Sequence, residues 1–135
     1  WTSKNGDVWT AQTTDLGVSD ALSNILHTAS GWVALQRHES QSAHELRLVT
    51  STDGEHWTIA SVLPTSSSVI ALNIAKMIDT GAGLATVGWE YNTTNGVKLG
   101  AMLTTSDGVT WNRKVFTDGG ADGNDVHLQK EVAKG

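Results

Sequence analysis

Two short segments of the sequence hold residues that could bind a metal ion. His38 and His44 lie within residues 37–45, RHESQSAHE, at a separation of six positions. A zinc-binding helix places its two histidines four positions apart, so this spacing predicts a solvated loop rather than a metal site. Residues 118–125, DGGADGND, combine carboxylates with glycines, but their order does not match an EF-hand loop. We expect no metal or cofactor and a plain connector in this second segment, with Ca²⁺ as the alternative at Asp118, Asp122 and Asp125.

Two tryptophans and one asparagine offer different kinds of contact with carbohydrate. Trp32 and Trp89 belong to segments that match each other in the sequence. An exposed indole at the end of a strand can stack on a sugar face, so both are candidate ligand-binding residues. The alternative, which we favour, is that they pack between neighbouring sheets. Asn92 begins the sequon Asn-Thr-Thr in a polar segment, where a eukaryotic protein would offer it for N-glycosylation.

The composition argues against several classes of function. The net charge is −5 and the nine Lys and Arg residues are scattered, so no basic stripe is present for a nucleic acid or an anionic membrane surface. The chain has no cysteine, which excludes disulfides and cysteine-ligated zinc and leaves the redox compartment open. No apolar run approaches the roughly 20 residues of a membrane helix. We therefore expect neither nucleic-acid binding nor membrane insertion.

A tryptophan-ending motif occurs three times and sets the organisation of the chain. The copies are SKNGDVWT (residues 3–10), STDGEHWT (51–58) and TSDGVTWN (105–112). Their tryptophans, Trp9, Trp57 and Trp111, are separated by 48 and 54 residues. A period of about 50 residues with strand-like content is typical of a propeller or another repeat array. The segments between the copies also match each other, as GWVALQ matches GLATVG.

Each repeat is predicted to contain four strands. The first is NILHTA or ALNIAKMI, the second WVALQR or LATVGWEY, the third LRLVTS or AMLTTS, and the fourth WTIASVL or WNRKVF. Several of them carry consecutive apolar residues, which indicates strands that are buried on both faces. No 3.6-residue apolar stripe persists, and β-branched residues are common, so helices are not expected.

The repeated motif is predicted to form a tight hairpin between the third and fourth strands. Its carboxylate or amide oxygen accepts hydrogen bonds from loop N–H groups, a hydroxyl adds a second local partner, and a glycine takes a positive φ. The tryptophan then covers the turn with a large apolar surface. This assigns a structural role to Ser3, Asn5, Gly6, Trp9, Ser51, Asp53, Gly54, Trp57, Thr105, Asp107, Gly108 and Trp111.

These hairpins resemble the Asp-box, or BNR repeat, of sialidase-type β-propellers. The usual pattern is Ser/Thr-x-Asp-x-Gly-x-Thr-Trp. Here glycine follows aspartate directly, the spacing is one residue shorter, and Asn5 replaces aspartate in the first copy. The resemblance extends as repeats over nearly the whole chain. It implies the propeller fold, and it says little about activity because the box lies away from the ligand-binding centre in that family.

Sialidase chemistry is a poor match to this sequence. Sialidases resemble one another in an arginine triad, a Tyr–Glu nucleophile pair, an Asp acid/base and an early Arg-Ile-Pro segment. The chain has no Arg-Ile-Pro, and its three arginines, Arg37, Arg47 and Arg113, are expected at the surface. Glu90 and Tyr91 are neighbours and would point to opposite faces of a strand. Other glycosidases need two carboxylates facing across a cleft, and no spacing here favours any pair. We predict no catalytic residue.

The fold class expected is all-β, a propeller segment of four-stranded antiparallel blades. Residues 1–21 form the last two strands of one blade, 22–64 and 65–118 form two full blades, and 119–135 form the first strand of the next. The chain begins at Trp1, without Met, and ends within a repeat, so we expect a portion of a larger ring of about six or seven blades. Assembly of several copies into one ring is the alternative.

The function expected is that of a non-catalytic binding or scaffold module at the cell surface or outside the cell. Its partners would be the remaining blades, in the parent chain or another polypeptide, together with a protein or glycan ligand. The alternative is part of a sialidase-like or other glycoside hydrolase, and an intracellular assembly factor with the same fold stays open. The first strands supply mainly His27, Asn73, Lys76, His127 and Lys130, which is a poor catalytic set.

Overall fold

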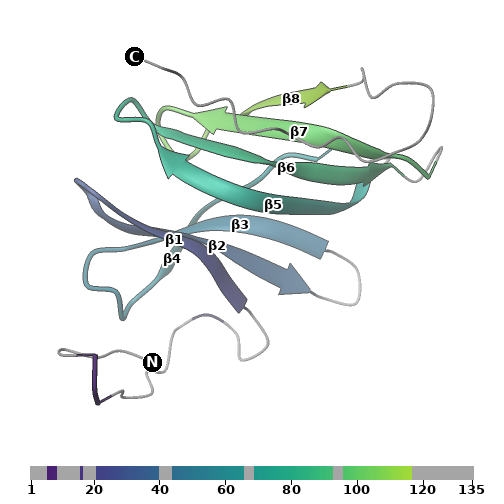
Figure 1. The fold of residues 1–135 in the computed structure, drawn as a ribbon. Coiled ribbons are helices and arrows are strands. Elements are labelled where there is room, and N and C mark those ends of the chain that lie inside the picture. Colours follow the sequence, from purple (N-terminus) through teal and green to yellow (C-terminus); the bar gives the residue numbers. More distant parts are fainter. Residues whose placement is uncertain are drawn as a thin grey trace. The chain divides into compact units, whose positions relative to one another are not determined.

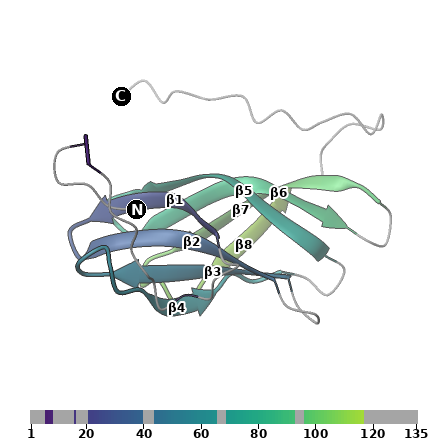
Figure 2. The same cartoon turned by 90° about the horizontal axis from the view of Figure 1, so that it is seen from below.

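The computed structural model describes residues 6–8, 16, 21–39, 44–65, 69–92 and 96–116, and every regular element within them is a β-strand (Figures 1 and 2). The chain divides into two units, Trp1–Leu63 and Pro64–Gly135, each with one four-stranded sheet. The all-β class and the two four-stranded antiparallel sheets predicted from the sequence are confirmed. Neither sheet closes on itself, and the propeller stays a prediction.

The first sheet is a meander of four antiparallel strands. Its strands are β1 (Ala21–Thr28), β2 (Gly31–Glu39), β3 (His44–Ser51) and β4 (Thr58–Val62), and each one pairs with the next in the order of the sequence. Consecutive pairing requires only short connections, which the turn residues between the apolar runs provide.

The second sheet repeats this topology. It contains β5 (Val69–Asp79), β6 (Leu84–Asn92), β7 (Lys98–Thr105) and β8 (Asn112–Phe116), again paired in sequence order. The eight strands predicted between residues 22 and 118 are thus all present, with ends that shift by a few residues.

The middle strands of the first sheet are buried on both faces. Four consecutive residues of β2, Val33 to Gln36, are each at most 8% exposed, although successive side chains of a strand point to opposite faces. On one of these faces Ala34 and Val49 pack with Trp57 and Leu16 in a single apolar cluster, and Leu22 borders it. This burial agrees with the consecutive apolar residues in the sequence. In the second sheet the buried residues include Leu72, Met77, Thr86, Ala101 and Leu103.

The first hairpin of each sheet is built in the same way. Thr28 Oγ1 donates to the carbonyl of Gly31 at 3.1 Å, and Thr80 Oγ1 donates to that of Gly83 at 3.0 Å. Gly83 has a φ of +142°, and a Cβ there would lie 2.0 Å from the carbonyl oxygen of Thr105. Glycine is therefore required where the second strand starts beside the end of the third.

Two local predictions from the sequence are wrong. Residues 37–45 were expected to form a loop, but β2 continues to Glu39 and β3 begins at His44. The cross-strand pair of His38 and Glu45 extends the ladder, which polar residues do readily at an exposed sheet end. Asn92 was expected in a loop, but it is the last residue of β6 and pairs with Val69. The partial blade predicted at 119–135, and nearly all of that at 1–21, lies outside the described residues.

We predict that Gly88→Ala destabilises the second sheet by about 1–3 kcal/mol, because the new methyl group cannot be accommodated. A Cβ at Gly88 would lie 1.9 Å from the carbonyl oxygen of Asn73, on the paired strand β5. The measurement is the free energy of unfolding in urea. The control is Gly81→Ala, where a Cβ meets nothing within 4 Å and only the positive φ of +77° adds a cost, about 1–2 kcal/mol at most. The steric argument would be contradicted if both variants were as stable as the wild type, or if Gly81→Ala lost more unfolding free energy than Gly88→Ala.

Candidate functional site

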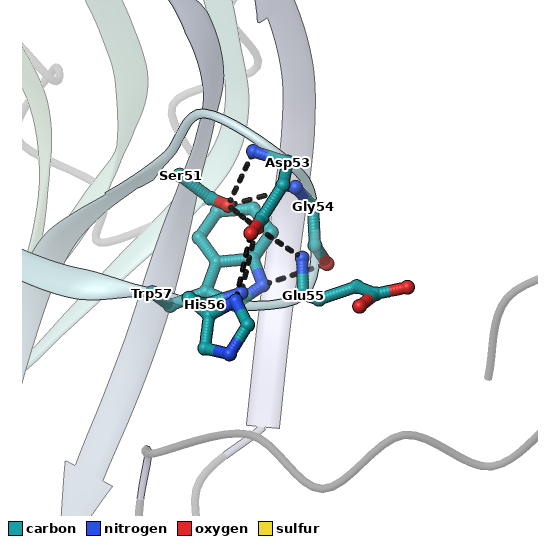
Figure 3. A network of polar contacts seen from close by, with 6 residues as sticks. All are labelled: Ser51, Asp53, Gly54, Glu55, His56 and Trp57. Atoms are coloured by element: carbon teal, nitrogen blue, oxygen red, sulfur yellow. Dashed lines mark hydrogen bonds and ion pairs between the residues drawn. The ribbon is translucent and has the colours of Figure 1, made fainter.

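The turn between β3 and β4 is held by one serine hydroxyl. We call residues 51–57 the first aspartate turn (Figure 3). Ser51 is buried at the end of β3, and its Oγ accepts hydrogen bonds from the backbone N–H of Asp53 at 3.3 Å and of Gly54 at 2.8 Å. The same hydroxyl donates to Asp53 Oδ1 at 3.0 Å. The hydroxyl thus joins the end of the strand to the aspartate of the turn.

The carboxylate of Asp53 then fixes the rest of this turn. Its Oδ1 accepts hydrogen bonds from the backbone N–H groups of Glu55 and His56, both at 2.8 Å. Its Oδ2 lies 2.7 Å from Nδ1 of the His56 ring (Figure 3). A carboxylate has several acceptor positions, so one side chain can satisfy N–H groups that no strand partner reaches.

Trp57 connects this turn to the core of the first unit. Its indole Nε1 donates to the carbonyl of Gly54 at 3.1 Å, and the side chain is only 6% exposed. The ring packs in the cluster with Ala34 and Val49. Burial of an indole whose N–H is satisfied combines a large apolar contribution with no polar penalty.

The turn between β7 and β8 repeats these contacts. In this second aspartate turn, residues 105–111, Thr105 Oγ1 accepts from the N–H of Gly108 at 2.9 Å and donates to Asp107 Oδ1 at 2.9 Å. Asp107 Oδ1 accepts from the N–H groups of Val109 at 2.8 Å and Thr110 at 2.7 Å. Each contact has its counterpart in the first turn, and the two agree within about 0.1 Å.

The glycine of each copy has nearly the same backbone conformation. Gly54 and Gly108 have φ values of 80° and 74°, and Gly6 of the first motif copy has 81°. These glycines take the positive φ that the sequence predicted. Ser3, Asn5 and Trp9, which complete the first copy, lie outside the described residues.

The two turn aspartates are held in their charged form. The backbone N–H of His56 is the main cause that lowers the pKa of Asp53 well below its ordinary value, and the His56 ring adds to this effect. The pKa of Asp107 is lowered likewise, mainly by the backbone N–H of Thr110 and then by that of Val109. Hydrogen bonds to a carboxylate favour the ionised state. Such groups suit a structural role, since a general acid needs a raised pKa.

We predict that Asp53→Asn combined with Asp107→Asn flattens the acid dependence of stability. Because the folded pKa values are depressed, the unfolded chain binds more protons below about pH 4, so this stabilisation is present above that pH and is lost as the pH falls. Asparagine keeps an acceptor oxygen and removes only the charge. Between pH 7 and pH 2.5, the free energy of unfolding in urea should fall less in the double variant than in the wild type. Glu55→Gln, on an exposed side chain of the same turn, is the control, and parallel curves for all three proteins would refute the prediction.

One ion pair in the second unit is buried. Glu90 on β6 is 2% exposed, and its carboxylate is bound by the guanidinium of Arg113 on β8 through two nitrogens, Nε at 3.1 Å from Oε2 and the terminal nitrogen at Oε1. The two residues lie on either side of β7, so the pair joins non-adjacent strands. Arg113 and Arg47 were both expected to be plain surface arginines, but their side chains are only 25% and 19% exposed and each is paired with a glutamate. Arg47 instead bonds Glu45, its neighbour on β3.

We predict that Arg113→Met costs about 3 kcal/mol of unfolding free energy at pH 7, because it leaves the buried Glu90 charge without its partner. Arg47→Met is the matched control, since its partner Glu45 is 34% exposed and can be rehydrated at a cost of about 1 kcal/mol or less. If urea unfolding gave equal losses of free energy for the two variants, the buried Glu90–Arg113 pair would contribute no more to stability than the exposed pair.

A groove lies at the turn end of the first sheet and has a volume of about 410 Å³. Trp32, one of the two tryptophans predicted to contact ligand, lines it and is 37% exposed. Val33 and His56 also line it, and the remaining lining residues carry hydroxyl groups: Thr28, Ser30, Thr50, Ser51, Thr52 and Thr58. The groove therefore combines one large aromatic surface with several short polar side chains.

The indole of Trp32 contacts one aromatic ring and lies near the first aspartate turn. The His27 ring, on the paired strand β1, meets it edge to face with ring centres 4.7 Å apart and an angle of 75°. On the side of the first aspartate turn, a Cβ at Gly54 would lie 3.6 Å from Trp32 Nε1. Trp89, the second candidate, has the ammonium group of Lys98 over its ring at 4.7 Å. Trp32 lines the groove at the turn end of the first sheet.

The other candidate positions form no site within the described residues. No three His, Asp or Glu side chains among them are grouped as a metal site requires, and Asp118, Asp122 and Asp125 lie beyond residue 116, where the description ends. His38 and His44 lie on the adjacent strands β2 and β3. The described residues contain no helical segment with the length and apolar character that a membrane span requires.

No protein-family model matches this chain, and no curated protein or solved structure matches it either. The function must therefore be argued from the residues and their geometry. Sequence reasoning identified the turn residues and named Trp32 as a candidate, and it missed the Glu90–Arg113 pair and the groove. A charged residue between apolar neighbours in a predicted strand, as Glu90 is, was the one available signal for a buried partner.

Proposed function

We propose that this chain forms blades of an Asp-box-type β-propeller that acts as a non-catalytic binding or scaffold module. The observation that carries the proposal is the repetition of the aspartate turn. Two sheets of identical strand order place the same hydroxyl, carboxylate and glycine between their third and fourth strands. A repeat unit of four consecutive antiparallel strands with a fixed corner is the unit of a propeller blade.

The burial of the first sheet supports stacking on both faces. Val33, Ala34 and Leu35 are consecutive in β2 and all nearly inaccessible to solvent. A blade within a ring has neighbours on both sides, whereas a sheet with one solvated face shows alternation of apolar and polar residues. The remaining blades would come from the parent chain or from another polypeptide, and they would also protect the edge strands.

The chemistry of the described carboxylates supports a role without catalysis. Glycoside hydrolysis by two carboxylates needs one acid with a raised pKa and a second carboxylate across a cleft. Here Asp53 and Asp107 accept hydrogen bonds from their own turns, and Glu90 is bound by Arg113. The hydrolase alternative has no comparable observation in its favour. The resemblance to Asp-box proteins supports a location at the cell surface or outside the cell, and the Trp32 groove supports a binding role.

We predict that the structure of the intact parent protein, determined by cryo-electron microscopy or crystallography, contains these two sheets as neighbouring blades around a central axis. The first strands, β1 and β5, would face the axis and β4 and β8 the rim, so both aspartate turns would lie at equivalent positions. The control is mass measurement of the 135-residue chain in solution, which tells a ring of several copies from a single chain. Two sheets packed face to face as a closed sandwich would refute the propeller.

A further inference from the structure

We infer that the groove beside Trp32 binds a neutral saccharide, with the indole as the stacking platform for one pyranose ring. This inference names the ligand class of the module proposed above and rests on that proposal only for the idea that the chain binds a ligand. The groove is built entirely from residues 28–58 of the first unit, so it does not depend on ring closure.

The Trp32 side chain has the properties of a preformed platform. It is large, more than a third exposed, and in a T-shaped contact with the His27 ring. Stacking of an apolar sugar face on an indole needs an open ring whose orientation is already set, because ordering a mobile side chain on binding costs conformational entropy. A pocket volume of about 410 Å³ suits a ligand of one to a few sugar rings.

The polar lining matches the hydroxyl groups of a sugar. Thr50 and Thr58 face each other across β3 and β4 with their Oγ1 atoms 3.3 Å apart, at an exposed position. A hydroxyl is both donor and acceptor, as each sugar hydroxyl is, so such a rim can pair with ligands of several stereochemistries. His56 adds an imidazole whose Nδ1 is occupied by Asp53, and Figure 3 shows its second ring nitrogen turned away from that carboxylate.

The charges of the groove favour a neutral ligand over an acidic one. The described residues that line it include no Lys, Arg, Asp or Glu. A carboxylate or sulfate is normally bound by guanidinium or ammonium groups, which are the strong partners for such anions. In addition, the carboxylate of Asp53 stands directly behind His56 at 2.7 Å. An anionic sugar would therefore meet a negative group without a matching arginine.

The second sheet shows that the fold itself does not require these groove residues. Trp32 pairs with Ser51 as Leu84 pairs with Thr105, so the two positions are equivalent. At that position the second sheet has a leucine, and Thr110 replaces His56 three residues after the turn aspartate. The turns around them are nonetheless the same. Since both sheets form the same hairpins, neither Trp32 nor His56 is needed for the fold.

The test is binding of the 135-residue chain to a printed array of neutral, sialylated and sulfated oligosaccharides, followed by calorimetry with the strongest neutral probe. We expect wild-type protein to bind at least one neutral glycan in preference to its charged counterparts. Trp32→Leu installs the residue found at the equivalent position of the second sheet, so it should fold and lose at least tenfold in affinity. Phe116→Leu, an aromatic-to-leucine change on β8 outside the groove lining, is the matched control and should bind within about twofold of wild type.

The location is checked by the indole N–H resonances in a two-dimensional NMR spectrum, where the Trp32 signal is assigned by its loss in Trp32→Leu. Titration with the neutral probe should shift that signal and leave the Trp57 signal in place. Binding of charged glycans alone, equal affinity of Trp32→Leu, or no binding of any neutral glycan at millimolar concentration would overturn the inference. None of these outcomes bears on ring closure, which the structure of the parent protein decides separately.

Discussion

Each sheet depends on the pairing of one carboxylate with the backbone N–H groups of a six-residue connection. Leaving the third strand, the chain must reverse within residues 52–57 or 106–111, which lie outside the strand ladders. Asp53 and Asp107 supply the acceptors, and the preceding hydroxyl ties that carboxylate to the strand end. Without this acceptor these exposed N–H groups would bond to water, and the turn would lose the hydrogen bonds that fix its conformation.

The aspartate turn also sets the positions of residues outside its own hydrogen bonds. The reversal places Trp57 against β2 and β3, so that the turn and the core of the first unit share one side chain. It also places Gly54 beside Trp32, at the edge of the groove. The second sheet keeps the same turn but differs in the residues around it. The copies in a repeat protein usually share their backbone structure and differ in the side chains that it carries.

The strands were predictable because their signals are local. Apolar runs, glycines and the aspartate motif identified all eight strands and their order along the chain, and the hydrogen-bond partners of Asp53 follow from the sequence spacing alone. The Glu90–Arg113 pair was not predictable, since it joins β6 to β8 across an intervening strand and depends on a register that the sequence does not state. The ends of β2 and β3 were wrongly predicted to be a loop for a related reason. His38 and Glu45 have weak strand propensity, and cross-strand pairing overrides it.

The short span of the aspartate turn has a consequence for the way in which the chain folds. The hydrogen bonds described for this turn join residues two or three positions apart, from Ser51–Asp53 to Trp57–Gly54. Closing so small a loop takes little chain entropy and is fast compared with the docking of distant segments. Each turn can thus form before the long-range contacts and align its two strands for zippering. Because each sheet has its own turn of this kind, the two sheets can begin folding independently of each other.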